Sequence, residues 1–204
     1  MVMIQVMSKI AIFSDLHLGV HQNNDYWLGI ANKWSDWFIN ELKDKGIDQI
    51  IFCGDFFHYR DEISVKTLNF AKDLLDKFKD FKMYMITGNH DAWYKDNSEI
   101  NSLSILKGYK NLKIYDKLTT IDIDEKRVSF CPWGVKINEI PKSDLIIGHF
   151  ELENFKMNSY KICDHGDDPD VLIEKCNLVF TGHFHQRAEK YFKEKDCNII
   201  YTGN

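Results

Sequence analysis

The sequence has no paired arrangement of cysteines. Its five cysteines are widely separated, form no Cys-x-x-Cys pair, and stand at Cys53, Cys131, Cys163, Cys176 and Cys197. This odd, scattered set favours reduced thiols in a cytoplasmic compartment over a disulfide framework. It also argues against a zinc site built from thiolates.

Long hydrophobic runs are absent as well. No apolar stretch approaches the roughly 18 residues of a membrane span, so no contact with a membrane is expected. Segment 1–7 is mildly apolar, but no basic region precedes it and no small-residue cleavage site follows, which argues against a signal peptide. We expect residues 1–7 to be an N-terminal extension, with Met7 as an alternative start, and residues 8–204 to form one domain.

The chain also lacks an excess of positive charge. Its formal net charge of −5 argues against bulk attraction to nucleic acid, which would need a local basic patch. Two bound divalent cations would change this locally, because they add positive charge at the place where a phosphate would bind. An anionic substrate is therefore compatible with the acidic composition.

The most informative pattern that is present is an apolar strand ending in polar, ligand-type residues. It occurs five times: 10–14 before Asp15 and His17, 50–53 before Asp55, 84–87 before Asn89, His90 and Asp91, 145–147 before His149, and 178–181 before His183 and His185. Open α/β sheets place their chemistry at the carboxyl ends of their strands. We therefore expect the five loops to meet at one edge.

Helical and strand patterns predict an α/β fold. Apolar residues recur at helical spacing over 25–45, with Gly46 as the cap and the tryptophans on the core face, and a second helix follows Ser64. The first ninety residues then read β-α-β-α-β, which indicates a parallel sheet. Further predicted elements are a short helix over 98–107, a meander or second sheet over 112–115, 118–123 and 127–132, a long loop over 151–170, and strands over 144–147, 177–181, 188–192 and 198–201.

The candidate ligands are oxygen and nitrogen donors without sulfur. They are Asp15, His17, Asp55, Asn89, His149, His183 and His185. Carboxylates suit hard divalent ions, and imidazole suits manganese, iron and zinc. Seven ligands exceed the needs of one tetrahedral zinc, whereas two ions sharing the Asp55 carboxylate accommodate all of them. Two such ions form a hydrolytic site for phosphate esters.

Three further residues are candidates for catalysis. His90 follows a predicted ligand and is placed to protonate the leaving group. Asp91 either orients His90 or serves the turn, and His58 is placed to contact the substrate phosphate. His21 and His165 stand outside this set, and we expect both at the surface.

These motifs resemble the calcineurin-like metallophosphoesterase superfamily. The resemblance rests on five motifs that occur in the order of that superfamily: Asp15-Leu-His17, Gly54-Asp55, Gly88-Asn89-His90-Asp91, Gly148-His149 and Gly182-His183-Phe-His185. The resemblance implies a two-sheet β-sandwich flanked by helices and a dinuclear centre. One ion would take Asp15, His17, Asp55 and His185, the other Asp55, Asn89, His149 and His183, and His90 would be the acid.

Within the superfamily, the chain is similar to the SbcD/Mre-type DNA repair nucleases, and among these to small subunits of phage recombination endonucleases. Gly54-Asp-Phe-Phe-His58 and Gly148-His-Phe-Glu-Leu152 support this. The similarity implies manganese-dependent exo- or endonuclease activity on DNA in recombination and double-strand-break repair, with iron, magnesium or zinc as other metals. It also implies an SMC-like ATPase partner, a possible homodimer and, for a phage protein, the host cytoplasm.

Those nucleases continue into a capping region, whereas this chain stops at Asn204 directly after an apolar strand, so we expect a truncated domain.

The alternative activity is that of a phosphomonoesterase or small-nucleotide phosphodiesterase on the same centre. The serine/threonine phosphatase branch is disfavoured because it expects Gly-Asp-x-x-Asp-Arg-Gly and Gly-Asn-His-Glu, where this chain has His58-Tyr59-Arg60 and Asp91. A non-catalytic scaffold is opposed by the presence of every ligand and of His90.

Overall fold

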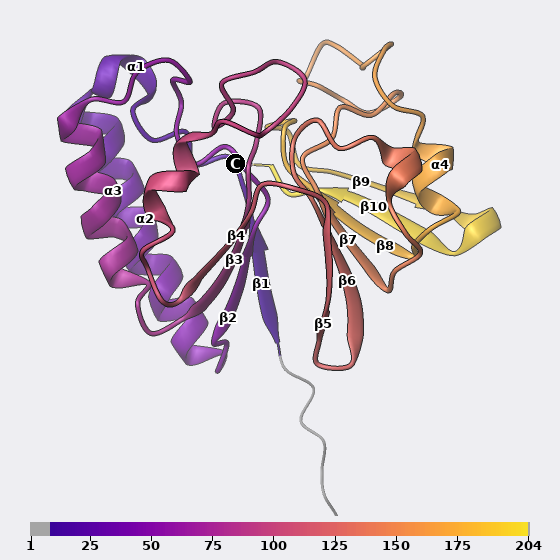
Figure 1. Ribbon diagram of the computed structural model, residues 1–204, viewed down its shortest axis with the longest axis horizontal. Helices are drawn as coiled ribbons and strands as arrows, with labels where there is room; N and C mark the ends of the chain where they lie inside the picture. The colour runs from indigo at the N-terminus through magenta and orange to yellow at the C-terminus, as the bar shows by residue number, and fades with distance from the viewer. Residues whose placement is uncertain (1–8, 204) are drawn as a thin grey trace, which may run out of the picture.

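Two β-sheets lie face to face, and helices cover their outer sides (Figure 1). The computed structural model describes residues 9–203; the segment 1–7, expected to be an N-terminal extension, and Asn204 lie outside the described residues. The expected two-sheet sandwich flanked by helices is thus confirmed. Among the described residues, none of the helices has both the length and the apolar composition of a membrane span.

The first sheet is entirely parallel, with strand order β1-β2-β3-β4. Its strands are β1 (Ile10–Phe13), β2 (Gln49–Phe52), β3 (Lys82–Ile86) and β4 (Leu112–Tyr115). The predicted β-α-β-α-β order of the first ninety residues is confirmed. The run at 112–115 differs from the expectation, because it extends this sheet as β4 instead of beginning the second one.

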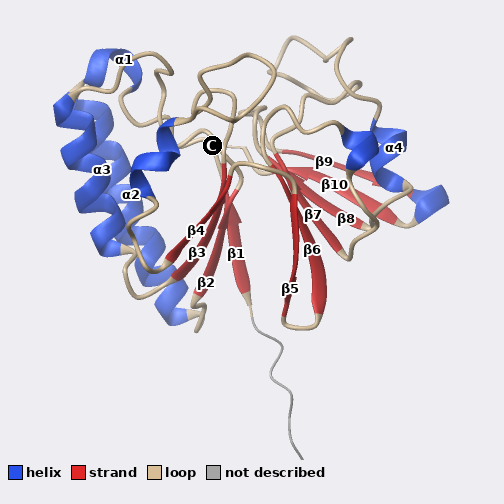
Figure 2. Cartoon of the chain, in the orientation of Figure 1, coloured by secondary structure: helices blue, strands red, loops and turns tan. Residues whose placement is uncertain are grey.

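Two long helices make the crossovers of the first sheet, α2 (Asp25–Asp44) and α3 (Val65–Lys77), and a short segment, α1 (Val20–Asn23), precedes them (Figure 2). The predicted cap at Gly46 is present: φ is 62° there, and the Ile47 N–H donates to the Leu42 carbonyl at 2.8 Å, as in a Schellman motif. The Ser64 side chain caps α3 by accepting the Thr67 N–H.

The second sheet is mixed, with strand order β5-β6-β7-β8-β10-β9. Its strands are β5 (Thr119–Ile123), β6 (Lys126–Cys131), β7 (Leu145–Gly148), β8 (Leu178–Thr181), β9 (Ala188–Phe192) and β10 (Cys197–Tyr201), and α4 (Pro169–Ile173) lies beside them. The helix predicted over 98–107 is only a short 3-10 turn, η1 (Ser102–Leu106); two more such turns are η2 (Ile137–Glu139) and η3 (Lys193–Lys195).

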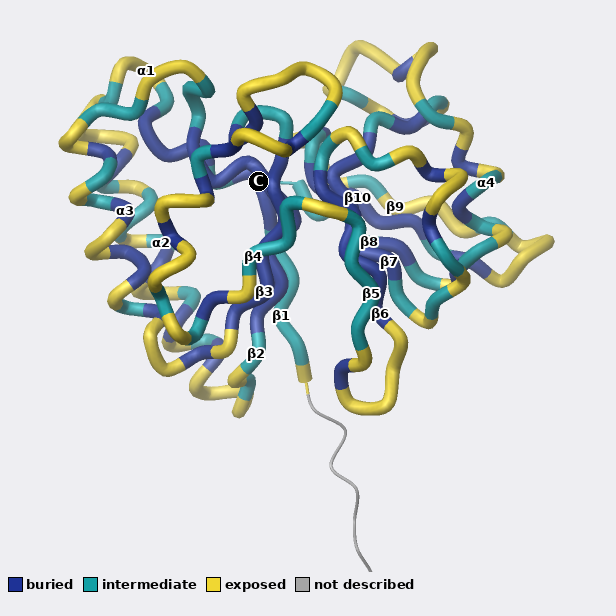
Figure 3. The backbone as a smooth tube through the Cα atoms, viewed as in Figure 1, coloured by how far each residue is buried: buried dark blue, intermediate teal, exposed yellow. Residues whose placement is uncertain are grey.

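The core forms three apolar layers. In Figure 3 the buried stretches of the chain run along strands of both sheets. One lies between the helices and the first sheet, with Phe52 and Leu74 fully buried. A second lies between the sheets, where Ile51 packs near Phe130, and the third lies on the outer face of the second sheet. Since both sheets are held in this stack, the carboxyl ends of β1, β2, β3, β7 and β8 are fixed at one edge.

The expectation that the tryptophans of α2 are core residues is wrong for two of them. Trp27 is 42% exposed and Trp37 is 56% exposed, while Trp34 packs against the core. Ile30, on the same predicted apolar face, is also exposed. The apolar face of α2 is wider than the part of the sheet that it covers, so its margins reach solvent.

Candidate metal centre

Four predicted ligands have a left-handed backbone although none is glycine. The φ angles are 59° at Asp15, 46° at His17, 61° at Asp55 and 88° at His183. Such conformations cost about 1 kcal/mol or more each and concentrate at functional sites. Hydrogen bonds between the loops stabilise them, since the Asp15 N–H donates to the Gly54 carbonyl and the His17 N–H to the Asp55 carbonyl, both at 3.0 Å.

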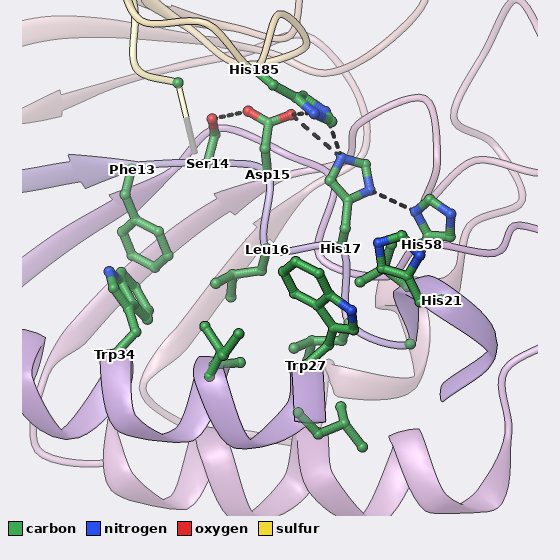
Figure 4. Close-up of a pocket in the computed structure, with 17 residues that line it drawn as sticks. Phe13, Ser14, Asp15, Leu16, His17, His21, Trp27, Trp34, His58 and His185 are labelled. Atoms are coloured by element: carbon green, nitrogen blue, oxygen red, sulfur yellow. Dashed lines mark hydrogen bonds and ion pairs between the residues drawn. The ribbon is translucent and has the colours of Figure 1, made fainter. Parts of the chain in front are cut away.

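A first group of side chains gathers around the carboxylate of Asp15. The Nε2 atoms of His17 and His185 lie 3.9 and 3.8 Å from Asp15 Oδ1 and 2.9 Å from each other. His17 Nε2 also lies 3.5 Å from Asp55 Oδ2. Three of the four residues that the resemblance assigns to one ion, Asp15, His17 and His185, thus place ligand atoms within 4.8 Å of one another (Figure 4). The fourth, Asp55, joins them through its contact with His17.

A second group lies on the other side of Asp55. His149 Nε2 is 3.3 Å from Asp55 Oδ2 and 2.9 Å from Asn89 Oδ1, and His183 Nδ1 is also 2.9 Å from Asn89 Oδ1. His149 Nδ1 donates to the Cys53 carbonyl at 2.7 Å, which leaves Nε2 directed at the centre. All seven predicted ligands are thus brought together, and one oxygen of Asp55 faces both groups.

Burial and charge set the protonation of these side chains. Burial lowers the pKa of both His17 and His183 to about 3, so both rings are neutral with a free lone pair. Burial acts against ionisation of Asp55, but the charge and hydrogen bond of His149 outweigh it and lower the pKa of Asp55. Conversely, the charge of Asp55 outweighs burial at His149 and raises its pKa to about 9. A cation bound there would displace that proton.

The donor set fits a pair of divalent cations. Buried Asp15, Asp55 and His149 place ligand atoms within 4.8 Å of one another, and so do Asp15, His17 and His185. Asp15 and Asp55 are only 3% and 1% exposed, and buried carboxylates are costly unless positive charge is close by. Neutral imidazoles together with carboxylate and amide oxygens are the donors that manganese, iron or zinc accept.

The three predicted catalytic residues occupy the same edge. The rings of His58 and His90 are stacked with centroids 5.2 Å apart, and His90 Nδ1 lies 2.6 Å from the His58 carbonyl oxygen. Because that carbonyl can only accept, His90 carries a proton on Nδ1, and Nε2 is the atom that can exchange a second proton with a substrate. His58 Nδ1 lies 3.3 Å from His17 Nδ1, which sets its ring beside the first ligand group.

Asp91 lies beneath these residues and does not contact the His90 ring. Its carboxylate accepts the backbone N–H groups of Asp55, Phe56, Phe57 and Gly88 at 2.9 to 3.0 Å. Burial and the charge of Asp55 raise its pKa to about 7, while the backbone donors act against this. Of the two roles considered for Asp91, the geometry favours the structural one in the turn.

Two residues reach the site without having been predicted as part of it. The Trp133 ring lies 5.2 Å from the His183 ring, and Glu151 Oε1 lies 3.9 Å from His183 Nε2. Trp133 follows the end of β6, and Glu151 stands two residues after His149. Both residues follow strands that end at the shared edge, and this position in the sequence could have predicted that they reach the site.

A family model described as calcineurin-like phosphoesterase matches residues 8–187. The chain belongs to this family, whose fold implies divalent metal ions. The superfamily expected from the motifs is therefore confirmed.

Among its relatives is exonuclease subunit 1 of Enterobacteria phage T4, which is 34% identical over 207 residues. The alignment covers 96% of this chain and 58% of that protein, so the chain spans less than two thirds of the relative's length. The expected similarity to a phage nuclease subunit is thereby confirmed at the level of sequence.

Two solved structures share the fold. The TT1561 protein of Thermus thermophilus is 11% identical, with a TM-score of 0.57 over 96% of this chain and 88% of that chain. The phosphopantetheinyl hydrolase of Mycobacterium tuberculosis is 11% identical, with a TM-score of 0.51 over 94% of this chain and 87% of that chain. At these identities the likeness concerns the fold alone.

Proposed function

We propose that residues 8–204 form a metal-dependent phosphodiesterase domain that cleaves DNA, as an exo- or endonuclease subunit in recombination and double-strand-break repair. The observation that carries this proposal is the placement of one Asp55 oxygen, 3.5 Å from His17 Nε2 and 3.3 Å from His149 Nε2. A carboxylate between two donor groups suits a bridged pair of cations. Such a pair supplies an activated water and positive charge for a phosphodiester.

The residues of this chain supply the remaining functions. In its imidazolium form, His90 donates the proton on Nε2 to the leaving oxygen and becomes neutral, while the His58 carbonyl accepts the hydrogen bond from its Nδ1–H. The His58 ring contacts a nonbridging phosphate oxygen. Asp15, His17 and His185 would hold one cation, Asn89, His149 and His183 would hold the other, and Asp55 could serve both. Manganese is the proposed metal because the imidazole and carboxylate donors suit it.

A nuclease activity and a partner subunit are supported by the T4 relative, whose name describes a subunit of an exonuclease. DNA as the substrate and an SMC-like ATPase as the partner come from the resemblance of the motifs to the SbcD/Mre-type nucleases. Because the chain has a net charge of −5, bound cations would supply much of the local attraction to phosphate. We therefore expect DNA binding to depend on bound metal more strongly than on a basic surface.

The test is incubation with Mn²⁺ and linear DNA, followed by electrophoresis. We expect cleavage that a chelator abolishes and that Asp55→Asn abolishes. Asp73→Asn, an exposed carboxylate on α3, is the matched control and should cleave normally. Absence of cleavage by the chain, alone and with its ATPase, would contradict the proposal. Turnover of cyclic nucleotides or nitrophenyl esters without action on DNA would favour the small-substrate phosphodiesterase or phosphomonoesterase instead.

A further inference from the structure

A cavity of about 640 Å³ opens next to the candidate metal centre. One side is formed by Asp15, His17, His58 and His185, and the other by α2 (Figure 4). Its volume lies within the range of about 300–1,000 Å³ that is usual for small-molecule pockets. None of the proposed roles of the metal ligands requires a space of this size.

The wall opposite the metal ligands is aromatic and aliphatic. Trp27, Ile30 and Trp34 line it from α2, and Leu16 lines it from the loop after β1. In Figure 4 the Trp27 ring rises from α2 toward the loop that carries His17. Trp27 is 42% exposed, so a flat face of its ring is available to a ligand. An apolar wall of this kind suits a flat, uncharged group.

A second ring, that of His21, lies against Trp27. The two rings are stacked, with centroids 4.8 Å apart and an interplanar angle of 28°. His21 also lines the cavity. The surface position expected for His21 is correct, but its ring forms part of an aromatic platform beside the metal centre.

The backbone that presents His21 is held in an unusual conformation. His21, Gln22 and Asn23 are all left-handed, with φ of 54°, 60° and 57°. The side-chain oxygen of Asn23 accepts the hydroxyls of Ser64 and Thr67 at 2.9 and 2.6 Å, which ties this turn to the start of α3. Consecutive left-handed non-glycine residues are costly and persist where the surroundings fix them, often around a ligand.

We propose that this cavity is a nucleobase subsite, in which an unpaired base of the DNA strand stacks on the face of the Trp27 ring that His21 leaves open, while an adjacent phosphate lies at the metal centre. The inference rests on the proposed function, because it takes the phosphate position from it. A base within a duplex has both faces covered by its neighbours, so the subsite selects a frayed, single-stranded or flipped nucleotide. Since the wall is mostly apolar, stacking operates without choosing between bases.

The test compares two ligands that differ only by the base. Deoxyadenosine 5′-monophosphate and deoxyribose 5-phosphate are measured by equilibrium dialysis against the full chain with Mn²⁺. We expect the nucleotide to bind about 5- to 150-fold more tightly, the range of one base–aromatic stack. Trp27→Ala should abolish most of this preference. His21→Ala, which leaves α2 intact, should reduce it and serves as the second variant should Trp27→Ala fail to fold.

The matched control is Trp37→Ala. Trp37 lies on the same helix and is 56% exposed, but it does not line the cavity, so its replacement should keep the preference. Equal binding of the two ligands by the native chain, no binding of either, or a preference that survives in folded Trp27→Ala would each overturn the subsite. Hydrolysis of bis(4-nitrophenyl) phosphate by the native chain is measured in parallel. If the native chain hydrolyses the ester but does not prefer the nucleotide in binding, only the subsite is contradicted. If it prefers the nucleotide but shows no metal-dependent hydrolysis, the proposed function is contradicted and the base-binding cavity is not.

Discussion

Asp91 holds the backbone of Asp55, with its Oδ2 accepting the Asp55 N–H at 2.9 Å. The same carboxylate accepts the N–H groups of the next two residues and of Gly88. The residue that faces both ligand groups is thus fixed from below by a second buried acid. Because Gly88 directly precedes Asn89, this one carboxylate also joins the loops after β2 and β3.

Replacing Asp91 by Asn should therefore destabilise the protein and weaken its metal binding. The amide offers one acceptor oxygen and turns a donor group toward N–H groups that are themselves donors. Leaving buried donors unpaired costs about 1–3 kcal/mol each, and we expect a loss of roughly 3 kcal/mol in the free energy of unfolding. Urea titration of the metal-free chain measures this. Unchanged stability together with unchanged affinity for Mn²⁺ would show that the carboxylate does not hold the loop.

A methyl group at Gly88 should disturb the centre, whereas one at Gly29 should not. A Cβ at Gly88 would collide with the Asp55 carboxylate and backbone, while one at Gly29, within α2, meets nothing within 4 Å. Gly88→Ala should thus lower both activity and stability. Gly29→Ala should raise the free energy of unfolding by about 0.5–1 kcal/mol, because alanine is the better helix former. Thermal unfolding of the two variants gives the comparison, and equal shifts would count against the geometry.

The fall in kcat after removal of the His90 ring should depend on the leaving group of the substrate. If His90 protonates the leaving oxygen, His90→Ala should lower kcat on DNA by about 10²- to 10⁴-fold. A nitrophenyl ester needs little protonation of its leaving group and should lose far less. Tyr160→Ala, which removes a ring that is 99% exposed and lies outside the candidate metal centre, is the control. Equal losses on both substrates would indicate a role in binding or folding instead of proton transfer.

Variants of the shared carboxylate and of the second ligand group should lose different numbers of metal ions. Asp55→Asn removes the shared carboxylate and should abolish tight binding of both ions. Asn89→Ala removes a donor of the second group alone, since Asn89 contacts His149 and His183 but none of the first group in the described interactions. Elemental analysis after dialysis should give about two metal ions for the native chain, about one for Asn89→Ala and none for Asp55→Asn. Loss of both ions from Asn89→Ala would argue for a single coupled site.

The five cysteines should resist alkylation in the folded state. All are free and buried, burial raises the pKa of each thiol, and that of Cys197 rises to about 11. Iodoacetamide at pH 8, followed by mass spectrometry, should modify them only after unfolding. The same shifts predict that stability falls above about pH 9, because thiols then ionise in the unfolded chain but keep their protons in the folded one. Constant thermal stability from pH 8 to 10.5 would contradict this.

Most strands, and the polar residues at the carboxyl ends of five of them, could be predicted from the sequence alone, although the run at 112–115 was expected outside the sheet that it joins. Each signal was local: an apolar run, a stop at glycine, and an acid or histidine directly after it. Parallel crossovers then placed the loops after β1, β2 and β3 at one edge without further information. The family motifs assigned the ligand residues to two groups, and the distances around Asp55 agree with that grouping.

The surroundings of those ligands could not be predicted, because they depend on how distant parts of the chain pack. Helical periodicity marks the apolar face of α2, but it does not tell how much of that face the sheet covers, so Trp27 was expected in the core and lies in a cavity. Nor does the sequence show that Asp91 reaches back 36 positions to Asp55 while leaving the ring of its neighbour His90 untouched. Such contacts arise from the packing of distant loops, and this packing is fixed by the stacked sheets as a whole.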